Sequence, residues 1–203
     1  MFEVYLFVNP IGIYCYDVEC QTRLATDELN LKISLHYIPL VNQQAIIADI
    51  KHRRLNCEKI DHPVAYTQLA CKALHYYHAI KFNYGNRAAR NFLATVQDSL
   101  KNDCSSCYFI FFDEVCRKLH LDINDIHELL DSAEVADSID KDQELAELWH
   151  IESVPTTVIF DLEEDQGTLI DGKIDCNDLM EIFSNHSYNP HSSKYSLRKL
   201  RLL

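Results

Sequence analysis

The amino-acid sequence is rich in thiols, with 8 cysteines among 203 residues. Cys104 and Cys107 form a Cys-x-x-Cys sequence, a spacing found both in redox-active dithiols and in zinc sites. Cys116 and His120 would supply the two further ligands that a tetrahedral zinc site needs. Cys116, however, lies in an apolar stripe of an expected helix, which favours packing in a core. We therefore predict no metal site, and redox chemistry at Cys104 and Cys107 stays open as an alternative.

The histidines and carboxylates show none of the arrangements that common catalytic sites use. None of the 10 histidines belongs to an H-x-x-x-H or H-E-x-x-H sequence. His75 and His78 are three residues apart, and we predict that they lie on the surface of a helix. The sequence has no glycine-rich phosphate loop, no nucleophile triad and no paired catalytic carboxylates. We therefore predict no cofactor.

The start of the chain, MFEVYLFVNP, lacks the basic residues and the cleavage site of a secretory signal peptide. No apolar stretch reaches the roughly 18 to 20 residues that a membrane-spanning helix needs. We therefore expect a cytoplasmic protein with reduced thiols and no membrane partner. The net charge of −12 at pH 7 argues against binding to nucleic acid, because the phosphate backbone would be repelled.

The elements that must position these groups alternate at first between strand and helix. Residues 2–8 are apolar on both faces, which is typical of a central strand. A helix is expected over residues 14–28, and a second strand over residues 32–38 ends at Pro39. A strand, a helix and a strand with a short return form a βαβ unit, so we predict that the two strands are parallel neighbours.

Between residues 63 and 149 the hydrophobic period changes to that of helices. One continuous apolar face is formed by Tyr66, Leu69, Ala70, Ala73, Leu74, Tyr77 and Ile80, and we expect this helix to end at Gly85. Four further helices are expected over residues 89–100, 108–119, 124–130 and 133–149. Strands return at residues 156–160 and 168–170, followed by a helix at 175–183.

This order predicts an α/β protein with an inserted helical subdomain. The sheet domain would comprise residues 1–62 and 150–184, and the helical subdomain residues 63–149. The remaining residues, 185–203, are polar and basic, and we expect a flexible tail.

The layout resembles the thioredoxin fold with the helical insertion of DsbA-like proteins, and two short stretches carry the resemblance. The segment NPIGIYCY at residues 9–16 joins the first strand to the first helix, where family members place Cys-x-x-Cys. The segment SVPTT at residues 153–157 precedes a strand and resembles the family's cis-proline loop. That loop would present the backbone of Val154 to an extended peptide.

The resemblance makes Gly12 the telling residue of the first segment. Cys15 matches the second cysteine of the motif, whereas Gly12 stands where the attacking cysteine belongs. Dithiol exchange needs a thiolate that attacks and a second thiol that resolves, and glycine can do neither. The resemblance therefore implies a binding groove rather than a dithiol site, formed by Gly12, Ile13, Tyr14, Cys15, Val154 and Pro155.

Within the DsbA-like proteins, three segments resemble the cytosolic SpxH-type (YjbH-type) adaptors of Firmicutes. They are residues 7–10, residues 85–93 (GNRAARNFL) and residues 145–160 (LAELWHIESVPTTVIF). This resemblance implies a non-catalytic adaptor that binds an Spx-like redox regulator and promotes its degradation by the ClpXP protease. The alternative is a thiol-dependent oxidoreductase, perhaps linked to glutathione, that uses Cys15, because some DsbA-like glutathione enzymes lack the double-cysteine motif.

Overall fold

The computed structural model describes residues 1–54, 63–102, 111–162, 166–184 and 196–201. Its contacts divide the chain into two units. The first, which contains the sheet, comprises Met1–Val8, Tyr14–Ile38 and Trp149–Leu203. The second, which is helical, comprises Asn9–Ile13 and Pro39–Leu148.

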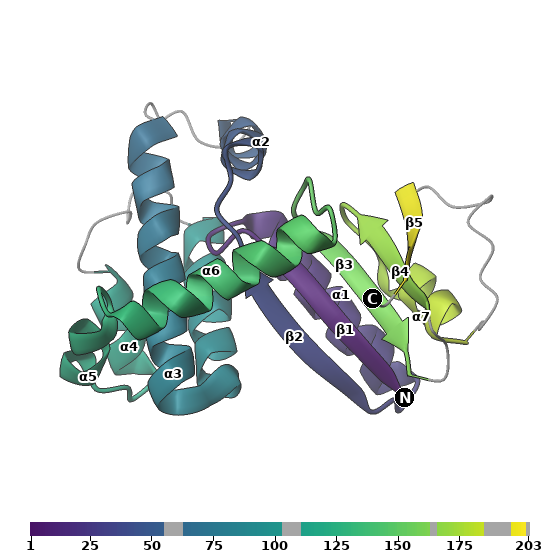
Figure 1. The fold of residues 1–203 in the computed structure, drawn as a ribbon, viewed down its shortest axis with the longest axis horizontal. Coiled ribbons are helices and arrows are strands. Elements are labelled where there is room, and N and C mark those ends of the chain that lie inside the picture. Colours follow the sequence, from purple (N-terminus) through teal and green to yellow (C-terminus); the bar gives the residue numbers. More distant parts are fainter. Residues whose placement is uncertain (55–62, 103–110, 163–165, 185–195, 202–203) are drawn as a thin grey trace. The chain divides into compact units, whose positions relative to one another are not determined.

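The first unit contains a five-stranded sheet in the order β2-β1-β3-β4-β5 (Figure 1). Its strands are β1 (Phe2–Val8), β2 (Ile33–Pro39), β3 (Thr156–Asp161), β4 (Gln166–Asp171) and β5 (Ser196–Arg201). β1 pairs antiparallel with β3, β3 with β4, and β4 with β5. The arrows of β1 and β2 run in the same direction in Figure 1, which agrees with the parallel neighbours predicted from the βαβ pattern.

Alternating residues of β1 face opposite sides of the sheet. The ring of Phe2 contacts Phe183 on α7 (Cys176–Ser184), with ring centroids 5.1 Å apart. The rings of Tyr5 and Phe7 instead contact Trp149, at 4.9 and 5.7 Å. The sheet is therefore covered on both sides, which explains why β1 is apolar on both faces.

The first and last helices of this unit are joined by a side-chain hydrogen bond. α1 (Ile13–Glu28) carries Gln21, whose Oε1 accepts a hydrogen bond of 2.9 Å from the backbone N–H of Cys176, at the start of α7. The side chain of Asp175 accepts a second bond, of 3.0 Å, from the N–H of Asp178. These two acceptors cap α7, and aspartate is among the residues favoured at this position.

The second unit contains α2 (Gln43–Arg54), α3 (Pro63–Asn102), α4 (Phe111–Lys118), α5 (Ile123–Leu129) and α6 (Ala133–Leu148). The seven residues predicted to form one apolar face of α3 are all buried. Gly85, with a φ of 81° and a ψ of 172°, has a non-helical backbone inside α3. The range of α3 therefore spans two helical segments joined at a kink, and the prediction that the first of them ends at Gly85 is confirmed.

Three polar side chains join α3, α4 and α5 within this unit. The hydroxyl of Tyr76 donates a hydrogen bond of 2.8 Å to Asp113, and Nε2 of His127 lies 2.9 Å from the same carboxylate oxygen. Burial and the bond to Asp113 raise the pKa of Tyr76 above its ordinary value. Tyr76 therefore stays a hydrogen-bond donor, and its ring stacks on Phe92 inside the helical core.

Two parts of the structure differ from the sequence prediction. α2 falls within residues 39–62, for which no helix was predicted, and its contacts group it with the helical unit. Residues 196–201 of the predicted flexible tail form the edge strand β5, paired with β4 over all six residues. Residues 185–195 lie outside the described part of the chain. No helix in the described residues is long and apolar enough to cross a membrane.

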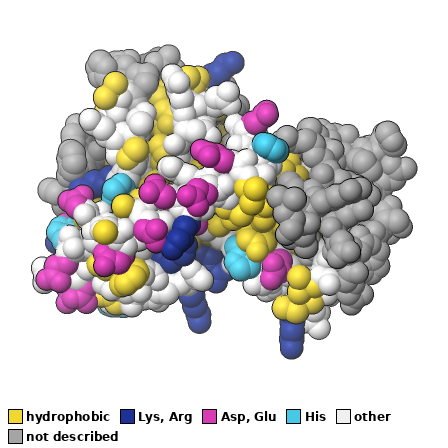
Figure 2. Space-filling view, viewed as in Figure 1, with side chains coloured by type: hydrophobic (Ala, Val, Ile, Leu, Met, Phe, Trp, Pro, Cys, Tyr) yellow, Lys and Arg dark blue, Asp and Glu magenta, His cyan; other side chains and the backbone are white. Residues whose placement is uncertain are grey.

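Acidic side chains dominate the charged surface of the helical unit. Figure 2 shows Asp and Glu side chains gathered over α5 and α6. Exposed acids on these two helices include Asp125, Glu128, Glu134, Asp137, Asp140 and Glu144. This distribution agrees with the net charge of −12.

Candidate functional site

The loop before β3 has the geometry that the resemblance implied. The peptide bond between Val154 and Pro155 is cis. The carbonyl of Pro155 accepts a hydrogen bond of 2.8 Å from the N–H of Gly172, which has a φ of 89°. The hydroxyl of Thr156 donates to the carbonyl of Ser153 at 2.7 Å. These bonds fix the loop on both sides of the cis peptide.

Val154 itself is left with an open backbone. Its N–H and C=O make no hydrogen bond with any residue in the described ranges, and its side chain is partly exposed. The pairing of Thr156 with Phe7 places the loop at the edge of the sheet where β1 ends. An extended segment of another protein can pair with such a backbone as an added strand would.

The turn between β1 and α1 is fixed around Asn9, in the helical unit. Its side-chain Oδ1 accepts a hydrogen bond of 3.1 Å from the N–H of Ile11, and its carbonyl accepts one of 3.0 Å from Gly12. The amide of Gln97 on α3 donates to the same carbonyl at 3.1 Å. Gly12 is thus held immediately before α1 begins, and it offers no side chain there.

Cys15 occupies the first turn of α1, and its side chain is only 3% exposed. It is a thiol rather than half of a disulfide, as are the other cysteines that the structure describes. A buried position suits a shielded thiol or a packed small side chain better than an attacking one. The four groove residues Tyr14, Cys15, Val154 and Pro155 fall in the sheet unit, whereas Gly12 and Ile13 fall in the helical unit.

Sequence reasoning missed Lys173, which links the cis-proline loop to α1. Its ammonium lies 3.3 Å from the ring centroid of Tyr14 and 3.5 Å from a carboxylate oxygen of Asp17. Lys173 directly follows Gly172, the residue that donates to Pro155. One turn of chain therefore contacts both Pro155 and Tyr14. The sequence Asp171-Gly172 is typical of a turn, but no local pattern connects the neighbouring Lys173 with α1, near the other end of the sequence.

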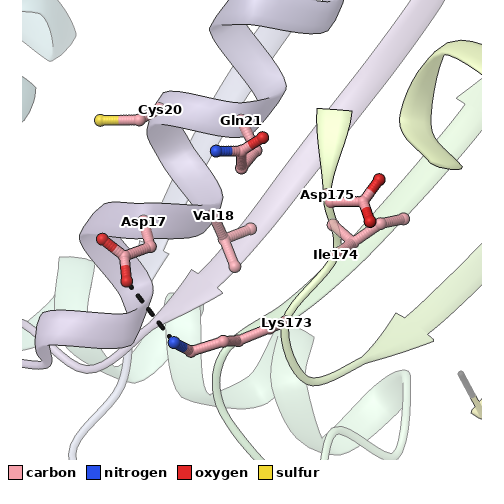
Figure 3. Close-up of a pocket in the computed structure, with 7 residues that line it drawn as sticks. All are labelled: Asp17, Val18, Cys20, Gln21, Lys173, Ile174 and Asp175. Atoms are coloured by element: carbon pink, nitrogen blue, oxygen red, sulfur yellow. Dashed lines mark ion pairs between the residues drawn. The ribbon is translucent and has the colours of Figure 1, made fainter. Parts of the chain in front are cut away.

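A surface pocket of about 310 Å³ adjoins Lys173 along α1 (Figure 3). Its lining residues are Asp17, Val18, Cys20, Gln21, Lys173, Ile174 and Asp175. Gln21 and Asp175 already cap α7, and Lys173 pairs with Asp17. The pocket therefore extends the surface beside the cis-proline loop, while most of its polar groups have structural partners.

The other sequence candidates are resolved in part. Cys116 is fully buried, and burial together with the carboxylate of Asp113 raises the pKa of its thiol to about 12. Its predicted role in core packing is confirmed. Cys104 and Cys107 lie outside the described residues. No group of three or more metal-binding side chains occurs in the part of the chain that the structure describes.

Comparison with known proteins identifies the class to which this fold and loop belong. A family model described as thioredoxin matches residues 5–181, and the chain therefore belongs to the thioredoxin family. The predicted fold class, a thioredoxin-like fold with an inserted helical subdomain, is confirmed. No functionally curated protein matches the sequence.

Several solved structures share the fold of this chain. A thioredoxin-like oxidoreductase from Silicibacter pomeroyi DSS-3 is 14% identical, with a TM-score of 0.61, over 90% of this chain and 84% of its own. The cytosolic disulfide reductase DsbM from Pseudomonas aeruginosa is 12% identical, with a TM-score of 0.56, over 90% and 97%. The oxidoreductase DsbA from Xylella fastidiosa is 10% identical, with a TM-score of 0.57, over 90% and 82%. These similarities show the fold.

Proposed function

We propose that this protein is a degenerate DsbA-like protein that binds a segment of a partner protein instead of exchanging disulfides. The proposal rests on what is found at the two segments that resemble the family, residues 9–16 and 153–157. The cis-proline loop is intact, with the Val154 backbone open, while the position of the attacking thiol is Gly12. The binding half of the site is present and the attacking half is missing.

Catalysis by dithiol exchange needs two sulfurs in sequence. The first attacks a disulfide and forms a mixed disulfide, and the second resolves it. Gly12 has no sulfur, and the thiol of Cys15 is buried. A partner segment can nevertheless lie along the cis-proline loop, because strand-like pairing uses only backbone N–H and C=O groups.

The side chains around the loop would define which segment binds. Lys173, half-exposed, places a cation beside the ring of Tyr14 and next to the loop. The pairing of Lys173 with Asp17 and Tyr14 holds the first turn of α1 in one arrangement. Such preorganisation reduces the entropy cost of binding.

The finer proposal is an adaptor in the cytoplasm that binds an Spx-like redox regulator and promotes its degradation by ClpXP. It is supported by the resemblance of residues 7–10, 85–93 and 145–160 to SpxH-type adaptors. The buried thiol and the open loop described above are compatible with this role, because an adaptor needs a docking surface and no turnover.

The proposal is tested with purified Spx, ClpXP and this protein. We expect co-purification with Spx and faster degradation of Spx when the protein is present. The variant Lys173→Glu should weaken binding, because it reverses the charge beside the loop. Lys141→Glu is the matched control, since Lys141 is also exposed and paired with an aspartate, on α6. Unchanged Spx turnover with folded protein would refute the adaptor role.

The second candidate is a thiol-dependent oxidoreductase that uses Cys15, perhaps with glutathione. It is favoured by the position of Cys15 in the first turn of α1. In addition, DsbM, one of the structural neighbours, has also been solved with GSH. Reduction of insulin or glutathione disulfide, lost in Cys15→Ser and kept in the exposed-thiol control Cys20→Ser, would establish this alternative.

A further inference from the structure

Two ionisable side chains face each other inside the contact between α3 and α6. His78 is 1% exposed and Asp142 is 7% exposed. Nε2 of His78 lies 3.6 Å from Oδ2 of Asp142, which is too far for a normal hydrogen bond. Neither of these two buried atoms has a hydrogen-bond partner among the described residues. The prediction that His78 lies on a helix surface is therefore wrong.

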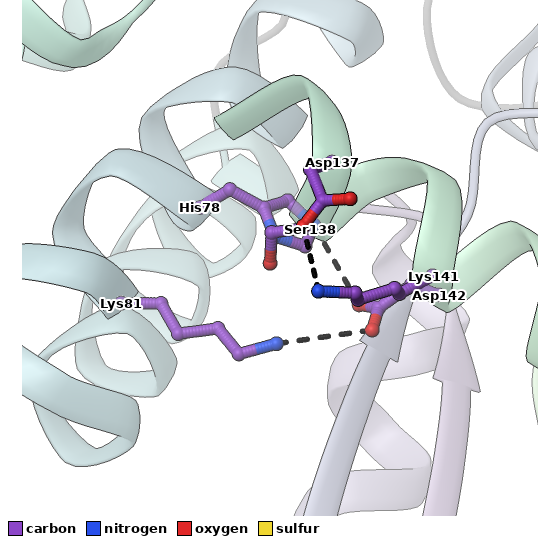
Figure 4. A network of polar contacts seen from close by, with 6 residues as sticks. All are labelled: His78, Lys81, Asp137, Ser138, Lys141 and Asp142. Atoms are coloured by element: carbon purple, nitrogen blue, oxygen red, sulfur yellow. Dashed lines mark hydrogen bonds and ion pairs between the residues drawn. The ribbon is translucent and has the colours of Figure 1, made fainter. Parts of the chain in front are cut away.

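Polar side chains of α3 and α6 lie around this pair (Figure 4). The other ring nitrogen of His78, Nδ1, lies 2.8 Å from the hydroxyl of Ser138 on α6. The ammonium of Lys81 on α3 lies 3.8 Å from Oδ1 of Asp142, so this oxygen has a weak ionic partner. Oδ2 of Asp142 and Nε2 of His78 have no other polar partner among the residues that the structure describes.

The other charged groups near the pair already have partners of their own. His75 on α3 places Nδ1 2.8 Å from the carbonyl of Leu130. Asp137 and Lys141 on α6 form an exposed ion pair with an N–O distance of 2.6 Å. Among the described residues, the charged groups that can respond to a proton at the pair are therefore His78, Asp142 and Lys81.

Leaving two buried polar atoms without hydrogen bonds is costly, and one additional proton removes the cost. If that proton lies between Nε2 and Oδ2, the pair forms a charge-assisted or acid–imidazole hydrogen bond of about 2.7–2.9 Å. The net charge of the pair is the same whether His78 or Asp142 carries the proton, because the two groups titrate as a unit. The carboxylate then attracts Lys81 less strongly.

We propose that His78 and Asp142 bind one shared proton in weakly acidic solution, and that this proton joins α3 to α6 by a hydrogen bond and weakens the hold on Lys81. The device is a proton-dependent clamp inside the helical subdomain. It does not depend on the function proposed for the cis-proline loop, since all of its residues belong to the helical unit.

The electrostatic environment supports this range of pH. Burial raises the pKa of Asp142 to about 6, although Lys81 acts in the opposite direction. Burial, with the charges of Lys81 and His75, lowers the pKa of His78 to about 3. The pair therefore takes up its first proton near pH 6 and resists a second one until the solution is strongly acidic.

The clamp is tested by NMR on the full chain, following the carboxyl carbon of Asp142 and the ring nitrogens of His78 from pH 8 to pH 4.5. We expect both residues to report one midpoint near 6, about two pH units above the value of an ordinary aspartate, 3.8. Amide protection along α6, corrected for intrinsic exchange, should change little between pH 7.5 and 5, because an opened segment takes up a proton on His78 in the same range, with its ordinary pKa of 6.5.

The matched variants are Asp142→Asn and Asp137→Asn, the same change on one helix. The first should abolish the titration of His78 near pH 6, and the second should leave it in place. An Asp142 carbon that titrates near 4, or a His78 ring that does not respond when Asp142 titrates, overturns the proposal. The wild-type titration decides the question even if Asp142→Asn fails to fold.

Discussion

The cis-proline loop of the sheet unit and the contact between α3 and α6 of the helical unit differ in how they hold their polar groups. At the cis-proline loop, the backbone N–H and C=O of Val154 have no hydrogen-bond partner among the described residues, and Lys173 nearby is half-exposed. In the helical unit, His78 and Asp142 are buried and face each other across α3 and α6. An open backbone is suited to recognising another molecule, whereas buried titratable groups are suited to sensing protons or fixing a helix contact. The helical unit thus carries a pair of buried titratable groups that is separate from the cis-proline loop.

We expect the largest effect in variants that break the buried pair of His78 and Asp142. It is measured as the change in the free energy of unfolding with pH. In His78→Gln, Asp142 keeps a folded-state pKa raised above its unfolded value of about 3.8, so the folded protein binds more protons. Stability should therefore rise, by up to about 3 kcal/mol, as the pH falls from 7 towards 4. Urea unfolding at a series of pH values measures it.

Asp142→Asn should give the opposite slope. His78 then keeps a folded-state pKa lowered below its model value of 6.5, so the unfolded chain binds more protons. Stability should fall by up to about 1.4 kcal/mol for each pH unit below 6.5. If the free energy of unfolding changed with pH in the same direction in both variants, the buried pair would be contradicted. In the wild type this free energy should change little between pH 7 and 5, because the contributions of Asp142 and His78 oppose each other.

A second prediction concerns two glycines of the sheet unit. A Cβ at Gly167 would lie 2.3 Å from the ring of Phe160, which pairs with Gly167 across β3 and β4. Gly167→Ala should therefore cost about 1–3 kcal/mol by overpacking. At Gly172 a Cβ meets open space, but the φ of 89° is unfavourable for alanine, so Gly172→Ala should cost about 1 kcal/mol. Equal losses in thermal unfolding would show that the Phe160 contact is not what restricts Gly167.

A third prediction separates binding from stability at the loop. Lys173→Met removes an exposed ion pair and a cation–π contact, which together should cost about 1 kcal/mol or less in unfolding experiments. Partner binding, measured by calorimetry with purified Spx, should weaken by a larger factor. A loss of stability without any loss of affinity would make Lys173 a purely structural residue.

The sequence predicted most of the elements because their hydrophobic patterns are local. β1 and β3 are short apolar runs with clear ends, and the buried face of α3 follows the helical period. α2 was missed because its sequence, QQAIIADIKHRR, has no clear apolar face. β5 was missed because the residues of β4 with which it pairs are more than 20 positions earlier in the sequence, and no local pattern predicts this pairing.

The site was predictable only where a family pattern exists. The cis-proline loop and the position of Cys15 followed from such patterns, whereas Lys173 reaches α1 through a contact distant in sequence. The burial of His78 did leave a local signal. It follows Leu74 by four residues and Tyr77 by one, which places it beside the buried face of α3.

The proposed function requires that the site at the start of α1 lacks an attacking thiol and could regain dithiol chemistry if one were supplied. It is tested most directly by comparing insulin reduction by the wild type, Gly12→Cys and Gly12→Cys/Cys15→Ser. Gly12→Cys restores a Cys-x-x-Cys spacing at the start of α1, where a dithiol can close. We predict background activity for the wild type, a clear gain in Gly12→Cys, and loss of that gain in the double variant. Turnover by the wild type that disappears in Cys15→Ser would contradict the account.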